Sequence, residues 1–228
     1  MPQPPDVDSV GRARARYIPA LRFDALTPLY DPLVALTTRE TRFKRRLLDQ
    51  ASLASGQRVL DVGCGTGTLA VEAWQARPGV VVAGLDGDQA VLGRAARKVA
   101  EEDAAVVLSE GFSDALPFPS GSFDRALSTL FFHHLSLDAK RRTFAELARV
   151  LRAGGELHVA DWGRPETMLM RIASWPLRLL DGVEQTRDNV EGRLPELMRD
   201  AGLVDVATLG GLSTAFGTMA FYRATAAA

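Results

Sequence analysis

Three glycines at alternate positions carry the clearest chemical signal in this chain. They stand in Val59–Gly67, where an apolar run contains Asp61 and is followed by Gly63, Gly65 and Gly67. Glycine lacks a Cβ and tolerates positive φ, so it suits a tight turn whose backbone touches a ligand. The G-x-G-x-G spacing differs from the G-x-G-x-x-G of dinucleotide-binding loops. A diphosphate needs donors and positive potential, so the nearby carboxylate instead favours a ligand with a cationic group. The alternative is a strand-to-helix turn that binds nothing.

A second carboxylate stands at the end of the next apolar run. Asp86 follows the glycines by about 20 residues, the distance at which an acidic side chain binds ribose hydroxyls in doubly wound folds. The two carboxylates together predict a ligand with a ribose and a cationic portion. Asp88 is the better candidate for the N-cap of the helix that follows.

Two adjacent histidines are the candidates for catalysis. His133 and His134 follow an apolar run, at the edge of the sheet where ligands of open α/β folds bind, and a histidine near its ordinary pKa can act as a general base. The structural alternative is that one caps the next helix and the other packs beneath the ligand. Asp161 ends a later run and is placed to pair with them, and Trp162 beside it would wall an apolar pocket. His158 lies inside that run and is expected to be a satisfied core residue.

Short apolar runs alternate with helical patterns from residue 57 onward. Their nearly continuous apolar character is typical of strands buried on both faces of a parallel sheet. The expected strands are Arg58–Val62, Val80–Leu85, Ala104–Leu108, Phe123–Thr129 and Glu156–Ala160. The expected helices between them are Thr66–Ala76, Asp88–Ala100 and Asp138–Arg152, the last capped by Ser136 and stopped by Gly154-Gly155. An amphipathic helix, Arg39–Ala54, is expected before the first strand.

The last third of the chain changes rhythm. A helix is expected over Asn189–Ala201, followed by strands Leu203–Leu209 and Thr214–Arg223 around a turn that contains Gly-Gly. Strands so close in sequence pair as an antiparallel hairpin. The sequence therefore predicts an α/β fold: a doubly wound, mostly parallel seven-stranded sheet that ends in an antiparallel hairpin, with helices on both faces.

The expected organisation is one domain with a lid. Residues 1–37 are predicted to form a flexible N-terminus and an entry segment that acts as a lid. Residues 38–228 are predicted to form a single domain with a lid insertion at about 164–190. The insertion holds Met168 and Trp175 in an apolar stretch, which suits a lid over an apolar substrate. A plainly packed helix and an interfacial membrane helix are the alternatives.

The composition excludes several classes of protein. The chain has 228 residues, 46% of them hydrophobic, and a formal net charge of −1. This predicts a globular core without a field that attracts nucleic acid. Cys64 is the only cysteine, which rules out an intramolecular disulfide and makes the cytoplasm the expected location. No apolar run approaches the ~20 residues of a membrane span, and the polar first residues do not resemble a secretory signal. The three histidines lack metal-ligand spacing, so no metal is expected.

Four ordered motifs resemble those of class I S-adenosyl-L-methionine (SAM)-dependent methyltransferases. After VLDVGCGTG and Asp86 come GFSDALPFPSGSFD, FFHHL and LRAGGELHVADWG, and FDALTPLYDP upstream is similar to a segment of quinone-biosynthesis C-methyltransferases. The resemblance implies a Rossmann-like methyltransferase fold, SAM as cofactor and S-adenosyl-L-homocysteine (SAH) as product. Many relatives carry an acid where Phe112 stands, so ring contact is expected from Phe112 and backbone bonding from Ser113. The cofactor-binding residues implied are Tyr30, Asp61, Gly63, Cys64, Gly65, Thr66, Gly67, Asp86, Gly87, Phe112, Ser113 and Thr129.

The predicted function is methyl transfer to a small, largely apolar acceptor at oxygen, nitrogen or carbon. His134 and His133 are the catalytic candidates, and Tyr30, Trp162, Met168 and Trp175 are the substrate-binding ones. The alternatives are a phospholipid N-methyltransferase at a membrane surface, a methyltransferase of RNA or protein, a nicotinamide-dependent dehydrogenase and a SAM-binding protein without catalysis. The expected partner is a small molecule, with no nucleic acid, and the chain is expected to be a monomer or a homodimer.

Overall fold

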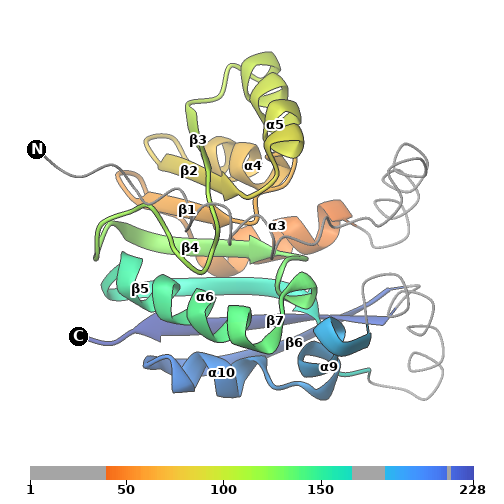
Figure 1. Ribbon diagram of the computed structural model, residues 1–228. Coiled ribbons are helices and arrows are strands. Elements are labelled where there is room, and N and C mark those ends of the chain that lie inside the picture. Colours follow the sequence, from red (N-terminus) through yellow and green to blue (C-terminus); the bar gives the residue numbers. More distant parts are fainter. Residues whose placement is uncertain (1–39, 166–182, 215–216) are drawn as a thin grey trace, which may run out of the picture.

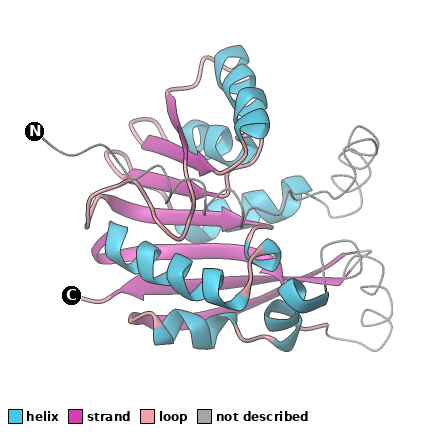
Figure 2. Ribbon diagram, in the orientation of Figure 1, coloured by secondary structure: helices cyan, strands magenta, loops and turns pink. Residues whose placement is uncertain are grey.

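The fold is a seven-stranded sheet with helices on both faces (Figures 1 and 2). The computed structural model describes residues 40–165, 183–214 and 217–228, and all structural statements refer to these residues. The strands are β1 (Arg58–Val62), β2 (Val81–Asp86), β3 (Val106–Glu110), β4 (Phe123–Thr129), β5 (Leu151–Trp162), β6 (Leu203–Thr214) and β7 (Gly217–Ala226).

The order of the strands confirms the predicted architecture. The sheet runs β3-β2-β1-β4-β5-β7-β6, and only β7 is antiparallel to its two neighbours. The carboxyl ends of β1, β2, β4 and β5 therefore meet at one edge. Asp61, Asp86, Thr129 and Asp161 all lie at or near these ends, so the topology gathers the predicted site residues along one side of the molecule.

The helices follow the predicted apolar spacing, with corrected ends. They are α3 (Glu40–Ala51), α4 (Thr68–Ala76), α5 (Gln89–Glu101), α6 (Leu137–Val150), α9 (Val183–Glu191) and α10 (Leu194–Asp200), and a short 3₁₀ turn, η1, covers Phe132–His134. Both predicted N-caps are confirmed. Asp88 accepts the N–H groups of Ala90 and Val91, and Ser136 accepts that of Ala139.

Apolar side chains fill the space on each face of the sheet. Residues of α3 and α4, such as Phe43, Leu47 and Leu69, pack on one face. Residues of α6 and α10, such as Phe144 and Leu197, pack on the other. Two complete layers of buried side chains thus hold the strand edge that carries the site.

His158 is a core residue, as expected, but only one of its ring nitrogens is satisfied. Its Nδ1 lies 3.0 Å from Nε2 of Gln50 on α3, while its Nε2 has no hydrogen-bond partner. Burial first, and then the charges of Arg125 and Arg223, lower the pKa of His158 to about 3. The ring is therefore neutral and takes no part in the site.

The predicted ends of two helices are wrong. The single helix expected over Asn189–Ala201 is divided between α9 and α10, because Gly192 adopts φ 76° and ends α9. The helix expected to run to Arg152 stops at Val150, because Leu151 already pairs with Phe123 as the first residue of β5. Strand β5 is correspondingly longer than the predicted Glu156–Ala160.

The Gly-Gly pair predicted to form the hairpin turn lies inside β6 instead. Thr208 pairs with Tyr222 and Gly211 pairs with Ala220, so two residues of β6 face one residue of β7. This is a β-bulge, and Gly210 provides its positive φ of 80°. The chain reverses between Thr214 and Gly217, where the two strands still pair.

A matched pair of glycine substitutions tests the backbone account. Gly67 precedes α4 at φ 75°, and an added Cβ would lie 3.1 Å from Cβ of Ala95. Gly67→Ala should therefore cost more than about 1 kcal/mol of unfolding free energy. Gly93 is exposed within α5 and an added Cβ would meet nothing within 4 Å, so Gly93→Ala should add about 0.5–1 kcal/mol. Urea unfolding measures both, and effects of the same sign would contradict the account.

Candidate active site

The glycine turn is built on β2 by backbone hydrogen bonds. Gly63, Gly65 and Gly67 adopt φ values of 68°, 54° and 75°. The N–H groups of Gly63 and Cys64 both donate to the carbonyl of Leu85, at 2.9 and 3.0 Å. The left-handed backbone explains the residue type at all three positions, because a side chain is strained there.

Asp61 is a buried carboxylate without a hydrogen bond of ordinary geometry. Its side chain is 1% exposed, and neither carboxylate oxygen has a hydrogen-bond partner of ordinary geometry among the described residues. Burial raises its pKa to about 7, against the nearby ammonium of Lys44. The negative charge of Asp86 raises the pKa further, and the backbone N–H of Ala70 opposes the shift. Lys44 on α3 is itself paired with Glu40. An unsatisfied carboxylate in this position fits a ligand that carries a positively charged nitrogen.

Asp86 holds the turn and keeps room for a ligand. Its Oδ2 accepts the N–H of Gly65 at 2.9 Å and its Oδ1 accepts the N–H of Asp88 at 3.0 Å. Burial raises its pKa, although backbone N–H groups of Asp88, Gly65 and Gly87 oppose that shift. A carboxylate has about four acceptor positions, so acceptor capacity remains for a hydroxyl of a vicinal diol such as that of a ribose.

The other predicted cofactor residues lie around this turn. Phe112 places its ring against Gly87, where an added Cβ would be 3.2 Å from the ring. Ser113 uses its hydroxyl in a 2.8 Å bond to Thr143, and its backbone is the part for which a cofactor contact is predicted. Cys64 is buried, and burial raises the pKa of its thiol, with Asp61 and Asp86 adding to the shift. That cysteine therefore stays protonated.

Two threonines are also among the predicted cofactor-binding residues. Thr66 lies in the glycine turn with its hydroxyl 3.4 Å from that of Thr68, and Thr129 ends β4 beside Ala160. The binding roles of the residues around the turn stay predictions.

Phe131 contacts the glycine turn, and the sequence did not predict this contact. Its ring lies where a side chain at Gly63 would project, 2.2 Å from an added Cβ. Leu130, just before it, adopts φ 50°, a strained conformation for a leucine. The contact joins segments separated by more than sixty residues, so Gly63 is required by this long-range contact as well as by its left-handed backbone.

The structure brings His133 and Asp161 together. His133 Nδ1 lies 2.7 Å from Asp161 Oδ1, and both side chains are buried. Asp161 also accepts the N–H groups of Phe131, Phe132 and Trp162. Burial raises the pKa of Asp161, but His133 and these hydrogen bonds outweigh it and keep the pKa below its ordinary value. The pair fixes the turn η1, and His133 is 3% exposed.

His134 is the histidine with some remaining exposure. Its ring centre lies 3.9 Å from that of His133. Burial, and then the proximity of His133, lower the pKa of His134 to about 3, and Asp161 only partly offsets this. His134 is therefore neutral at ordinary pH, able to accept a hydrogen bond but weak as a base.

Helix α9 packs against η1 and contributes a second residue that the sequence did not indicate. Asn189 is fully buried, and neither the nitrogen nor the oxygen of its carboxamide has a hydrogen-bond partner among the described residues. The predicted helix began at this residue, so its buried position inside α9 was not recognised.

The substrate-binding predictions fall mainly on other parts of the chain. Tyr30, Met168 and Trp175 lie outside the described residues, as does most of the predicted lid. Trp162 is 6% exposed and packs in the core on the α3 side, with its ring centre 6.4 Å from that of His133. Its contact with a substrate stays a prediction.

No described cluster of histidine, cysteine or acidic side chains is arranged to hold a metal ion. None of the described helices is long and apolar enough to cross a membrane.

The sequence matches a family model over the stretch from β1 into β5. Residues 59–155 match the model described as a methyltransferase domain. A demethylmenaquinone methyltransferase of Thermus thermophilus is 34% identical over 145 residues, which are 63% of this chain and 65% of the relative. The match thus spans slightly less than two thirds of that relative. The glycine turn and the histidine turn both lie within the residues that match the model.

Solved structures share the fold. Phosphoethanolamine N-methyltransferase 2 of Haemonchus contortus, in complex with phosphomonomethylethanolamine and S-adenosylhomocysteine, aligns with a TM-score of 0.65 and 19% identity over 82% of this chain and 53% of that one. The [4+2]-cyclase SpnF aligns with a TM-score of 0.59 and 24% identity over 74% and 60%. A cyclase among the neighbours means that the chemistry must be argued from the site.

The pH dependence of stability tests the state of Asp61. Its ordinary pKa is 3.8 and its folded value is about 7, so its contribution to stability is complete below pH 3.8 and is lost as the pH rises through 7. Asp61→Asn removes this loss. The Tm of the variant relative to the unmodified protein should be at least ~3 °C higher at pH 8 than at pH 5.

The control is Asp138→Asn, at an exposed aspartate of α6, which should show no such change between the two pH values. A constant difference for Asp61→Asn would mean that Asp61 is charged and satisfied throughout.

Proposed function

We propose that this protein is a SAM-dependent methyltransferase that acts on a small, largely apolar acceptor. The observation that carries the proposal is the pair of buried carboxylates at the glycine turn. Asp61, whose oxygens have no hydrogen bond of ordinary geometry among the described residues, suits the ammonium of the methionine portion. Asp86, which keeps acceptor capacity beside its bonds to backbone N–H groups, suits the ribose diol. A nicotinamide dinucleotide has a ribose but would bring a diphosphate towards these two carboxylates.

The chain's own contribution would be binding, orientation and exclusion of water. SAM supplies a methyl group on a sulfonium, which is already an activated leaving group. Asp61 and Asp86 would fix the cofactor, and the His133–Asp161 pair would hold η1 so that His134 faces the acceptor. Holding two reactants in line is itself worth several orders of magnitude in rate.

The acceptor class follows from the state of His134. A histidine with a pKa of about 3 accepts a hydrogen bond but removes protons poorly. This favours an acceptor whose nucleophilic carbon or oxygen is already activated by a ring hydroxyl of its own. A reduced quinone fits that description, and the relative named for demethylmenaquinone supports it.

The proposal also covers the location, the oligomeric state and the membrane contact of the protein. We place the protein in the cytoplasm, as the single, buried cysteine suggests. A monomer and a homodimer are both compatible with the proposed chemistry. Contact with a membrane surface belongs to the alternative, phospholipid N-methylation, which the Haemonchus neighbour suggests at 19% identity.

Steady-state kinetics with labelled SAM and a reduced, short-chain demethylmenaquinone tests the proposal. Asp86→Ala removes acceptors for the ribose and should raise KM for SAM by roughly tenfold or more, with kcat nearly unchanged at saturation. His134→Ala should lower kcat by roughly tenfold to a hundredfold, with KM for SAM unchanged.

The pH profile separates the possible roles of His134. Since its pKa is about 3, His134 should introduce no change in kcat between pH 6 and 8, and the two proteins should show profiles of the same shape. A break near pH 6.5 that disappears in His134→Ala would identify it as an ordinary general base. No label transfer to any reduced naphthoquinone would remove the proposed acceptor class.

A further inference from the structure

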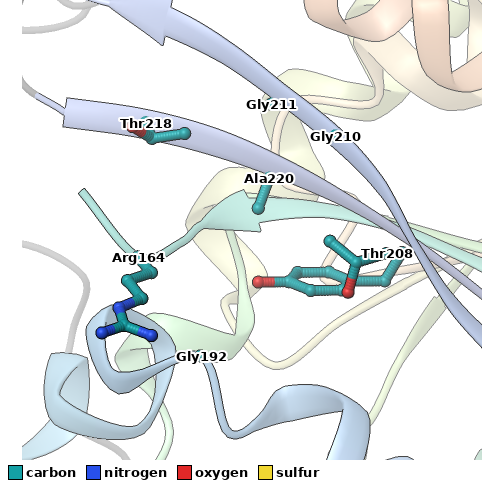
Figure 3. Close-up of a pocket in the computed structure, with 8 residues that line it drawn as sticks. Arg164, Gly192, Thr208, Gly210, Gly211, Thr218 and Ala220 are labelled. Carbon is teal, nitrogen blue, oxygen red and sulfur yellow. The ribbon is translucent and has the colours of Figure 1, made fainter. Parts of the chain in front are cut away.

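A pocket lies on the β6–β7 hairpin, on the far side of β5 from β4. It has a volume of about 260 Å³ and is lined by the hairpin, by Gly192 between α9 and α10, and by Arg164 just after β5 (Figure 3). Because Arg164 follows the carboxyl end of β5, the pocket opens at the edge of the sheet that carries the proposed site.

The β-bulge in β6 shapes one wall of this pocket. Gly210 and Gly211 line it, and the bulge that contains them is held from the opposite face by Arg46 of α3. The Arg46 guanidinium donates to the carbonyls of Leu209 and Gly211, at 2.5 and 3.1 Å, and lies 4.1 Å from the centre of the Phe221 ring. A bulge secured in this way is a fixed feature of the fold, and bulges are common beside active sites.

Small residues that pack closely against one another form the floor of the pocket. Ala220 lines the pocket, and a Cβ added at Gly163 would lie 2.4 Å from the Cβ of Ala220 and 3.3 Å from the Tyr222 hydroxyl. The absence of a side chain at Gly163 therefore leaves that hydroxyl at the floor. Figure 3 shows Arg164 and Thr208 on opposite sides of the space.

The polar groups that line the pocket suit an anion. Arg164 carries a permanent positive charge and is exposed, and Thr208 and Tyr222 contribute hydroxyls. Burial, and then the charge of Asp161, raise the pKa of Tyr222, so its hydroxyl stays protonated and donates. The lining contains no acidic side chain. An arginine beside hydroxyl donors is a common arrangement for binding a carboxylate.

One cross-strand residue pair links the lining of the pocket to the turn that carries the histidines. Ala220 pairs with Asp161 across β5 and β7, and paired residues point to the same face of a sheet. Asp161 in turn holds His133, next to His134. The pocket lining and the histidine turn are thus connected through the pair Ala220–Asp161.

We propose that this pocket binds a carboxylate of the acceptor through Arg164 and the hydroxyl of Tyr222. The substrate is then a hydroxylated aromatic acid, that is, a ring of the reduced-quinone type that also carries a carboxylate, with the ring directed at His134 and the carboxylate held at the hairpin. This inference rests on the proposed methyltransferase function and specifies its substrate class.

A pair of stable probes tests the proposal by calorimetry on the protein saturated with SAH. The probes are 1-hydroxy-2-naphthoate and 1-naphthol, which share the ring and hydroxyl and differ in the carboxylate. The protein should bind the naphthoate at least about tenfold more tightly than the naphthol. Arg164→Gln and Tyr222→Phe should each weaken naphthoate binding by roughly tenfold and leave naphthol binding within twofold. Arg164→Lys, which keeps the charge, should retain part of the preference.

The controls separate this inference from the proposed function. Arg141→Gln, at an exposed arginine on α6 paired with Asp138, should bind both probes as the unmodified protein does. SAH affinity and Tm should be unchanged in all variants, which shows that the fold and the cofactor site are intact. Equal affinity for the two probes, or a preference that survives both Arg164→Gln and Tyr222→Phe, overturns the pocket assignment. Failure of SAH itself to bind would overturn the methyltransferase proposal instead.

Discussion

The unpaired carboxylate of Asp61 is the constraint on which the site depends. Burying a carboxylate without donors is costly, and proteins usually satisfy or neutralise such groups. Here the fold places a second carboxylate, Asp86, nearby, and the closest balancing charge, Lys44, is already engaged by Glu40. The glycine turn holds both acids at the same sheet edge, because the left-handed φ of its glycines brings the chain back onto β2. Folding thus concentrates negative potential where a cationic ligand is proposed to bind.

Asp161, at the same edge, is the opposite case. It is equally buried, yet it accepts hydrogen bonds from His133 and from three backbone N–H groups. Its charge is therefore satisfied within the protein and serves to fix the turn that carries the histidines. The two aspartates differ in function because Asp161 accepts four well-formed hydrogen bonds, whereas neither oxygen of Asp61 accepts one of ordinary geometry among the described residues. This also assigns the two histidines different tasks: His133 orients the turn, and His134 retains some exposure.

Much of the architecture was predictable because it follows from local patterns. The apolar runs gave β1 and β4 with their exact ends, and the caps Asp88 and Ser136 are set by residues within the next turn of helix. The features that the sequence did not reveal depend on distant contacts. Gly210-Gly211 is typical of a turn, and only Arg46, more than 160 residues away, explains why it is a bulge inside β6.

The chemistry of the site was predictable to a similar extent. The positions of Asp61, Asp86 and the histidines could be placed at one edge from the strand order alone. Their protonation could not, because the raised pKa of Asp61 and the lowered pKa of His134 come first from burial. The long-range contact of Phe131 with Gly63, and the buried amide of Asn189, likewise depend on how the elements pack.

Proton release on SAH binding tests the central claim most directly. If Asp61 has a pKa of about 7 and receives the ammonium of the ligand, binding must ionise it. Calorimetric titrations at pH 6.5 in two buffers of different ionisation enthalpy would then give different binding enthalpies, and the difference corresponds to a substantial fraction of one proton released. The release should fall at pH 8 and be absent in Asp61→Asn. A binding enthalpy at pH 6.5 that does not depend on the buffer, or heat with NAD and none with SAH, would contradict this account.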